Sequence, residues 1–360
     1  MKIAPRPTRI LLCSYAFHPS IGGIETMGTF LAEHFIRRGL DIEVVTNSPG
    51  DERSAYDYGY PVHRRPDRKE LLRIVRRSDL VYQNNISLNY LWPLLLAPRP
   101  LVITNHTPID DTVEKSRLKR WLKIQVMRFA SCTSVSQYLA DTFPVPSRVI
   151  YNPHREKLFY VDPQLERTCD LVFVGRLSDA KGVDTLLRAL ALLAKKGLKP
   201  RLTIIGGGAE ERKLKDLSTD LGLDGEVDFI GPRQGPEIAR LLNQHQILVV
   251  PSRRKPAEAL GIVAIEGIAC GAVPVVSAQG GLPEAIGPCG LTFECENPQS
   301  LADALERLLA SAELREQLRQ PAKNFLRPFA EETIVDQYVD VFSAAMPDGK
   351  LTYRTDRSPN

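Results

Sequence analysis

The chain has 360 residues, of which 43% are hydrophobic and 25% charged, and its formal net charge is +4 at pH 7. This length suits two domains of about 100–200 residues each, and the composition excludes a largely disordered or collagen-like protein. The longest apolar stretch, around residues 91–97, is far shorter than the ~20 residues of a spanning helix, and Pro5 and Pro7 interrupt any signal-peptide core. We therefore expect a cytoplasmic protein with six reduced cysteines and no zinc site.

Short apolar segments alternate with helical patterns through the first half of the chain, and this order implies parallel strands joined by right-handed crossovers. The expected strands are 9–14, 41–46, 79–83, 100–104, 131–135 and 148–151, with a helix at 24–38. A charged segment at 152–168, which contains Pro153 and Pro163, has no strong period and marks a boundary. The N-terminal domain is therefore predicted to cover residues 1–162.

The same alternation restarts after the boundary and predicts a second doubly wound domain over residues 163–330. The expected strands are 170–175, 201–206, 227–230, 247–250 and 274–277, and the expected helices are 183–195, 209–221, 237–243, 262–270, 300–309, 312–325 and 331–345. Residues 346–360 are polar and are predicted to form a flexible tail. Two Rossmann-like domains facing across a cleft would bind ligands outside the carboxyl ends of their strands, so the loops after strands are the expected site.

Two glutamates, Glu258 and Glu266, flank the start of a predicted helix with seven residues between them. Gly261 lets a ligand approach the backbone, and the free N–H groups of Gly261, Ile262 and Val263 carry the positive end of the helix dipole. This arrangement suits a diphosphate, with the carboxylates accepting hydrogen bonds from sugar hydroxyls. A surface glutamate beside a chance loop glutamate fits the spacing equally well.

The segment Gly175-Arg-Leu-Ser-Asp-Ala-Lys-Gly182 directly follows a predicted strand. Its two cations, Arg176 and Lys181, are five residues apart on a loop at the same edge as the glutamates. Two cations near a helix N-terminus suit a diphosphate leaving group. Basic residues on loops are usually just solvated, so this segment alone is a weak signal.

These segments occur in order with Gly280-Gly281-Leu282-Pro283-Glu284, and together they resemble the large retaining glycosyltransferase family 4, whose fold is GT-B. The resemblance covers about residues 9–345 and is most specific over 170–310. In the N-terminal half it rests on Gly22-Gly23-Ile24-Glu25 and on the segment 134–139. It implies a hexosyltransferase with an N-terminal acceptor-binding domain and a C-terminal nucleotide-sugar-binding domain, and a 331–345 helix that crosses back to the N-terminal domain.

The resemblance also implies roles for individual residues. Glu266 would bind the ribose, Glu258 the transferred sugar, and the backbone near residues 230–232 and 206–208 the nucleobase. His106 would lie beside the sugar, whereas without the family it reads as a histidine that caps a strand end. The catalytic residues implied are Glu258, His106, Arg176 and Lys181, and the donor-binding residues implied are Gly22, Gly23, Gly175, Arg176, Lys181, Gly207, Ile230, Gly231, Glu258, Gly261, Ile262, Val263 and Glu266.

The implied reaction moves a sugar with retention from a UDP- or GDP-sugar to an acceptor hydroxyl, in polysaccharide or glycolipid assembly. No cofactor is expected, and no metal is required, because the chain has no Asp-x-Asp segment and the two cations would replace the metal. Two alternatives stay open, a sugar-nucleotide epimerase of the same fold and an inactive sugar-nucleotide-binding protein. An oxidoreductase fits poorly, since no Gly-x-Gly-x-x-Gly follows the first strand, and no nucleic-acid-binding module is recognisable.

Residues 114–130 combine six basic residues with an apolar stripe of Leu118, Trp121, Leu122 and Phe129. A basic amphipathic helix with a tryptophan is typical of segments that lie on anionic membranes, so we expect peripheral contact at the inner face of the membrane. Family members that act on lipid-linked acceptors often have a comparable helix. The competing interpretation is a surface helix whose apolar stripe packs on the N-terminal sheet.

Overall fold

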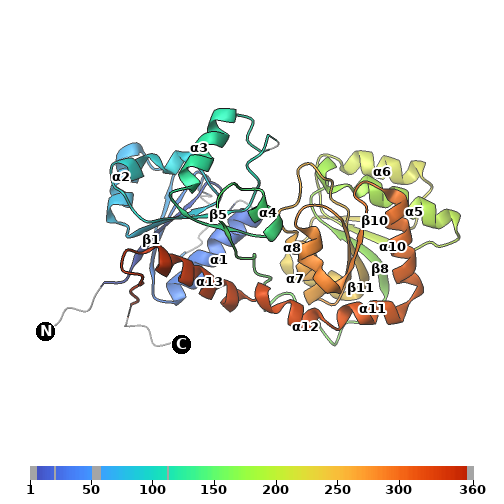
Figure 1. The fold of residues 1–360 in the computed structure, drawn as a ribbon. Helices are drawn as coiled ribbons and strands as arrows, with labels where there is room; N and C mark the ends of the chain where they lie inside the picture. The colour runs from blue at the N-terminus through green and yellow to red at the C-terminus, as the bar shows by residue number, and fades with distance from the viewer. Residues whose placement is uncertain (1–5, 20–21, 51–57, 112, 355–360) are drawn as a thin grey trace. The chain divides into compact units, whose positions relative to one another are not determined.

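The computed structural model describes residues 6–19, 22–50, 58–111 and 113–354. The chain divides into two compact units, Met1–Asn152 with Glu332–Asn360, and Pro153–Glu331 (Figure 1). The boundary expected after residue 162 lies further along the chain than this division. The segment between them belongs to the second unit, because the amide of His154 donates to the carbonyl of Phe329 at 3.1 Å and that of Asp162 donates to Oδ1 of Asn243 at 2.9 Å.

The first unit is built on a seven-stranded sheet with the order β3-β2-β1-β4-β5-β6-β7, in which all pairs are parallel. The strand order changes direction between β1 and β4, which is where ligands bind in sheets of this kind. The strands are β1 (Arg9–Ser14), β2 (Asp41–Thr46), β3 (Val62–Arg64), β4 (Leu80–Asn84), β5 (Leu101–Asn105), β6 (Ser131–Ser134) and β7 (Arg148–Val149).

Helices cover both faces of this sheet. A core of 0–8% exposed side chains joins α1 and α13 to one face, and a second core joins α2 and the η2 turn to the other. The helical elements are α1 (Gly23–Arg37), α2 (Arg68–Arg77), η1 (Leu88–Tyr90), η2 (Trp92–Leu95), α3 (Arg117–Met127), α4 (Gln137–Asp141) and α13 (Glu331–Ala345).

The late helix α13 packs against the first unit, beside α1 (Figure 1). The hydroxyl of Tyr338 lies 3.1 Å from Oγ1 of Thr104, and the ring of Phe342 lies 5.1 Å from that of Phe35. Residues 346–354 of the tail that was predicted as flexible pack on this unit. The amide of Arg354 donates to the carbonyl of Gly39 at 2.8 Å. Residues 355–360 lie outside the described residues.

The second unit has a six-stranded parallel sheet with the order β10-β9-β8-β11-β12-β13, so its direction changes between β8 and β11. Its strands are β8 (Cys169–Val174), β9 (Leu202–Ile205), β10 (Val227–Gly231), β11 (His245–Val250), β12 (Val273–Ser277) and β13 (Leu291–Phe293). Its helical elements are η3 (Asp179–Lys181), α5 (Val183–Lys195), α6 (Glu211–Asp220), α7 (Gly235–Gln244), α8 (Ile262–Ala269), α9 (Leu282–Ile286), η4 (Gly287–Cys289), α10 (Pro298–Ala310), α11 (Ala312–Arg319), α12 (Ala322–Phe325) and η5 (Arg327–Phe329).

The single helix expected over 312–325 is wrong, because two helices occupy this segment. α11 ends at Arg319 and α12 begins at Ala322. Pro321 lies between them, and a proline inside a helix removes one hydrogen bond and its ring clashes with the preceding turn. The helical period continues through the break, which explains why the pattern predicted one element.

We predict that Phe342→Ala destabilises the first unit by about 3–5 kcal/mol, because it removes a fully buried ring between α13, α1 and β4. Both tryptophans of the chain, Trp92 and Trp121, belong to the first unit, so urea unfolding followed by tryptophan fluorescence reports on that unit. Asp340→Ala, on the exposed side of α13, is the control and should change the stability by less than about 0.5 kcal/mol. Equal midpoints for the two variants would contradict the packing of α13.

Candidate functional site

The loops that follow β8 and β11 meet at the switch point of the second sheet. Lys181, at the end of η3, forms an ion pair with Glu258 through Nζ and Oε1. The hydroxyl of Ser252 donates to the same Oε1 at 2.9 Å, and the hydroxyl of Ser277 donates to the carbonyl of Ser252 at 2.6 Å. Two of the predicted catalytic residues are therefore in direct contact, and hydrogen bonds from Ser252 and Ser277 hold Glu258 and its loop.

Two glycines allow close contact between neighbouring loops at this edge of the sheet. Gly182 has a φ of +64°, and a Cβ on it would lie 2.1 Å from the carbonyl oxygen of Pro251. Gly280, with a φ of +56°, faces the carbonyl oxygen of Glu258, which a Cβ would approach to 2.3 Å. A side chain on Gly182 would push the loops after β8 and β11 apart and separate Lys181 from Glu258, whereas one on Gly280 would push the Glu258 loop away from the loop after β12.

The helix α8 begins directly after the Glu258 loop. Gly261, at its N-cap, has a φ of +89°, and the helix has no side-chain cap, so the amide hydrogens of Ile262 and Val263 have no intrahelical partner. These amides carry the positive end of the helix dipole. Free amides at a helix N-terminus attract an anion.

Glu266 lies one turn further along α8 and is the more buried of the two glutamates, with 13% of its side chain exposed against 22% for Glu258. Burial raises its pKa to about 7, and Arg155, whose Nη2 lies 3.7 Å from Oε1, opposes this shift only in part. Near neutral pH this carboxyl group thus exists in both protonation states. Hydroxyl groups can donate to the ionised form and accept from the protonated one.

Arg155 is a candidate that the sequence analysis missed. Its guanidinium also lies over the ring of Phe159, 5.2 Å from the centroid. The residue lies in the charged segment between the domains, where no motif or period marks it, and only the fold brings it to α8. A search of the sequence for cations that could balance Glu266 would have included Arg155 among many candidates, but nothing in the sequence would have singled it out.

The remaining expected donor residues gather at the carboxyl ends of β8, β9 and β10. The amide of Gly175 donates to the carbonyl of Ile205, and that of Gly206 donates to the carbonyl of Gly231 at 3.0 Å. A Cβ on Gly206 would lie 1.8 Å from the carbonyl oxygen of Gly175, so bare backbone is required here. Gly207 and Ile230 belong to the same group of strand ends.

Arg176 follows Gly175 on this loop but differs from Lys181. It is exposed, and within the described part of the chain its side chain makes no hydrogen bond or ion pair. The loop therefore holds one cation already neutralised by Glu258 and one that is available to a ligand.

The N-terminal candidates belong to the first unit. Gly22 and Gly23 start α1, and His106 follows β5. The His106 ring is almost buried, and Nε2 lies 2.8 Å from Oδ1 of Asn84 at the end of β4. Burial alone lowers the pKa of His106 to about 4, so the ring is neutral at physiological pH. Asn84 also donates to the carbonyl of Ile24 at 2.8 Å, which links His106 to the first turn of α1.

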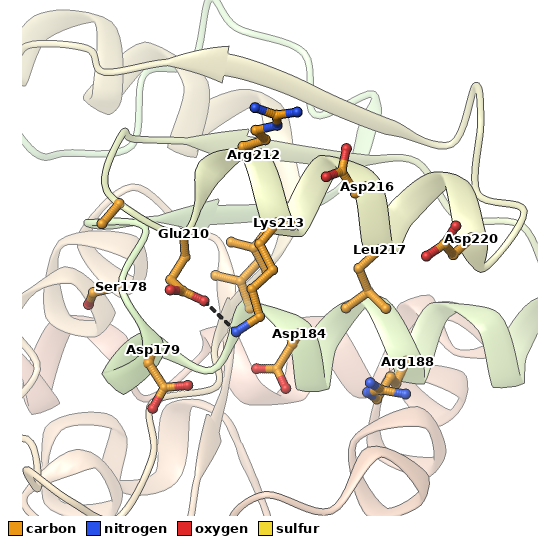
Figure 2. Close-up of a pocket in the computed structure, with 13 residues that line it drawn as sticks. Ser178, Asp179, Asp184, Arg188, Glu210, Arg212, Lys213, Asp216, Leu217 and Asp220 are labelled. Carbon is orange, nitrogen blue, oxygen red and sulfur yellow. Dashed lines mark hydrogen bonds and ion pairs between the residues drawn. The ribbon is translucent and has the colours of Figure 1, made fainter.

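A separate pocket of about 710 Å³ lies between α5 and α6 (Figure 2). Its wall carries opposite charges, and Lys213 pairs with Glu210, whose Oε2 lies 2.8 Å from Nζ (Figure 2). Ser178 and Asp179 line its end nearest the loop after β8, but none of the predicted site residues lines it. The pocket therefore adjoins the candidate site without being part of it.

Comparisons with known proteins identify the family. Residues 158–325 match the family Glycosyl transferases group 1, and residues 21–154 match Glycosyltransferase Family 4. The chain belongs to glycosyltransferase family 4. A D-inositol 3-phosphate glycosyltransferase of Saccharomonospora viridis is 35% identical over 188 residues, which cover 49% of this chain and 43% of that protein. The chain thus matches less than half of the length of this relative.

Solved structures show that this family 4 member has the GT-B fold. HepE of Anabaena, solved in complex with UDP, aligns with a TM-score of 0.80 and 21% identity over 94% of this chain and all of the other. Sucrose-phosphate synthase of Thermosynechococcus elongatus aligns with a TM-score of 0.76 and 22% identity over 93% of this chain and 98% of the other. At these identities the likeness establishes the fold alone.

The raised pKa of Glu266 predicts a pH-dependent stability that Glu266→Gln removes. The unfolded carboxyl group ionises near its ordinary pKa, whereas the folded one stays protonated to about 7, so the stability of the folded protein falls as pH rises through this range. At 1.36 kcal/mol per pKa unit, the wild type should lose up to about 3 kcal/mol relative to Glu266→Gln between pH 4 and pH 8. Calorimetric unfolding at several pH values measures this difference.

The matched control is Glu237→Gln, since 54% of the Glu237 side chain is exposed in the same unit. Its stability should follow that of the wild type at every pH. If the stabilities of Glu266→Gln and the wild type changed with pH in the same way, the pKa of Glu266 would not be raised.

Proposed function

We propose that this family 4 protein is a retaining glycosyltransferase that moves a sugar from a UDP- or GDP-sugar to an acceptor hydroxyl. The contact of Lys181 with Glu258, beside the free amides that begin α8, is the observation that carries the proposal. A cation, a hydrogen-bond acceptor and a helix N-terminus are the groups that would bind a sugar diphosphate. The UDP bound by the Anabaena protein of the same fold supports this choice.

The chemistry expected of these residues is electrostatic. Negative charge builds on the β-phosphate as the glycosidic bond breaks, and Lys181, Arg176 and the amides of Ile262 and Val263 would stabilise it. When the diphosphate binds, it would take over Lys181 and release Glu258 to accept hydrogen bonds from the sugar. Exchange of one anionic partner for another keeps the lysine neutralised throughout, which limits the desolvation cost.

The nucleoside part of the donor is assigned to Glu266 and to the strand ends around Gly207, Ile230 and Gly231. A ribose carries two neighbouring hydroxyls, and a carboxylate accepts hydrogen bonds from both. Ionised Glu266 is the form that accepts them, so donor binding should lower its pKa. The carboxylate would then be held by the ribose as well as by Arg155.

A metal ion has no part in this proposal. Across residues 6–19, 22–50, 58–111 and 113–354, no group of three or more metal-ligating side chains lies together. The test is a thermal-shift screen against UDP, GDP, ADP and dTDP with and without EDTA. Selective stabilisation that EDTA does not change, about 2.7 kcal/mol at a hundredfold excess over Kd, would support a metal-independent donor site. Lack of any shift in the folded protein would refute it.

The two alternative activities are separated by their products. An epimerase would release an isomer of the sugar nucleotide and needs no acceptor, whereas an inactive binding protein would show a thermal shift without turnover. Analysis of the nucleotide and sugar products by mass spectrometry and NMR distinguishes all three. The anomeric configuration of the product, measured by NMR, shows whether the reaction proceeds with retention.

The acceptor is proposed to be presented at a membrane, with contact through α3 and its flanks. The interpretation in which the apolar stripe packs on the sheet is contradicted, because Leu118, Trp121 and Phe129 are 65%, 56% and 88% exposed. The exposed cations Lys115, Arg117, Lys119 and Arg128 surround this stripe. No helix among the described residues is long and apolar enough to span a bilayer, so the contact would be at the surface.

We predict that Lys181→Ala mainly lowers kcat, while Glu266→Ala mainly raises the donor KM. Lys181 acts on charge that develops in the transition state, and loss of one such group usually reduces kcat by about 10²–10³-fold. Glu266 binds the ribose equally in the ground state and the transition state. Lys213→Ala, a 73% exposed lysine of the same unit, is the control and should leave both constants unchanged. Unchanged kinetics for both Lys181→Ala and Glu266→Ala would refute the roles assigned to them.

The membrane contact predicts co-sedimentation with vesicles that contain anionic lipid. Binding should weaken as the salt concentration rises and should be lost in a Trp121→Ser, Phe129→Ser double variant, because it combines apolar insertion with attraction between charges. Leu198→Ser is the control, since Leu198 is an exposed apolar residue of the second unit. Failure of the wild type to bind at low salt would exclude the membrane contact.

A further inference from the structure

Asn84 joins three segments at the carboxyl edge of the first sheet. It is fully buried at the end of β4, and its side-chain amide has three partners. Nδ2 donates to the carbonyl oxygen of Ile24 at 2.8 Å and to Oγ of Ser14 at 3.1 Å. A carbonyl oxygen only accepts hydrogen bonds, so this contact fixes which side of the amide is the nitrogen. Oδ1 is therefore the atom that lies 2.8 Å from Nε2 of His106.

This orientation decides where the His106 ring carries its proton. Oδ1 of Asn84 is an acceptor, so Nε2 must be the protonated nitrogen. Nδ1 then holds a lone pair and has no hydrogen-bond partner within the residues that the structure describes. The backbone of His106 is fixed as well, because its amide donates to Oδ1 of Asn85 at 3.1 Å. The ring is thus presented with one particular nitrogen left to accept.

The ring also lacks a charged neighbour. Burial is the single cause of its lowered pKa, and no acidic or basic side chain of the described residues contributes to it. His106 therefore does not gain a proton near neutral pH and is unsuited to act as a general acid. A neutral ring with Nδ1 free accepts a hydrogen bond from a hydroxyl group, whereas an ionised phosphate has no hydrogen to give.

We propose that Asn84 is a positioning residue that holds the proton of His106 on Nε2, so that Nδ1 accepts a hydrogen bond from a hydroxyl of the transferred sugar. The second part of this inference rests on the proposed function, whereas the first part does not. Asn84 itself touches neither sugar nor phosphate. It acts by fixing the tautomer and, through Ile24 and Ser14, by tying the ring to the start of α1 and the end of β1.

The proton position is measured directly by long-range ¹H–¹⁵N NMR of protein labelled with ¹⁵N-histidine. The chain has six histidines, and the His106 signals are assigned as those that His106→Gln removes. We expect the wild-type ring to be protonated on Nε2 alone. Asn84→Ala should give a mixture of tautomers, while the control Ser14→Ala, which keeps the contact between Asn84 and His106, should not. A wild-type ring protonated on Nδ1, or a mixture, would overturn the proposal.

The isosteric variant Asn84→Asp tests the hydroxyl contact and guards against a failure of Asn84→Ala to fold. A carboxylate at this position stabilises the imidazolium and raises the pKa of His106, so that Nδ1 carries a proton at neutral pH. We expect kcat/KM for the sugar donor to fall about tenfold near neutral pH, the loss of roughly one hydrogen bond, and to recover as pH rises. A purely structural role would lower the melting temperature and leave the shape of the pH profile unchanged.

Different results would refute the tautomer assignment and the hydroxyl contact. An unchanged pH profile in Asn84→Asp, with the imidazolium confirmed by NMR, would overturn the hydroxyl contact. If the wild type neither binds nor turns over any nucleotide sugar, the proposed function fails and the hydroxyl contact with it. The NMR result on the wild-type ring would still decide whether Asn84 fixes the tautomer.

Discussion

Parallel pairing in both sheets is the constraint on which the candidate site depends. Every strand of a parallel sheet ends at the same edge, so each loop that follows a strand starts beside its neighbours. In the second unit these loops lie so close that Gly182, Gly206 and Gly280 leave no room for a Cβ. Lys181 lies on one loop, Glu258 and the start of α8 lie together on another, and the two loops meet because their backbones approach each other closely. The site is a property of the sheet edge more than of any one loop.

The candidate site contains two ion pairs. Lys181 is matched by Glu258 and Arg155 by Glu266, which avoids isolated charges in partly buried positions. The two pairs are not equivalent, because Glu266 is buried deeply enough for its pKa to reach about 7. The first pair offers a cation to an incoming anion, and the second offers a carboxyl group to neutral hydroxyls. The division matches the two chemical parts of a nucleotide sugar.

Residues on a common local motif could be found from the sequence, and residues joined only by the fold could not. Glu258 and Glu266 lie on one continuous segment, and Arg176 and Lys181 lie on another, so the sequence predicted these residues as site residues. Arg155 and Asn84 reach Glu266 and His106 across long sequence separations, and neither lies in a pattern that marks it.

The same distinction between local and long-range features applies to the fold. Alternating strands and helices predicted two doubly wound units, because periodicity is local and survives in the sequence. The break between α11 and α12 depends on the ring of Pro321. The attachment of residues 346–354 depends on backbone partners that are distant in the sequence. The exposure of Leu118 and Trp121 also depends on what packs beside them, since an amphipathic pattern does not say whether its apolar side is covered.

The packing of α13 on the first unit has a consequence for synthesis of the chain. Five buried residues of α13 complete a core whose other buried members lie in the first half of the sequence; they are Ile334, Val335, Tyr338, Val341 and Phe342. At about 5–20 residues per second, roughly 10–35 s separate translation of Asn152 from that of Glu331. The nascent first unit leaves the part of its apolar sheet face that α13 covers exposed during this interval, while the second unit is contiguous and can fold as it emerges. The half of the protein that the ribosome makes first is therefore the half that matures last.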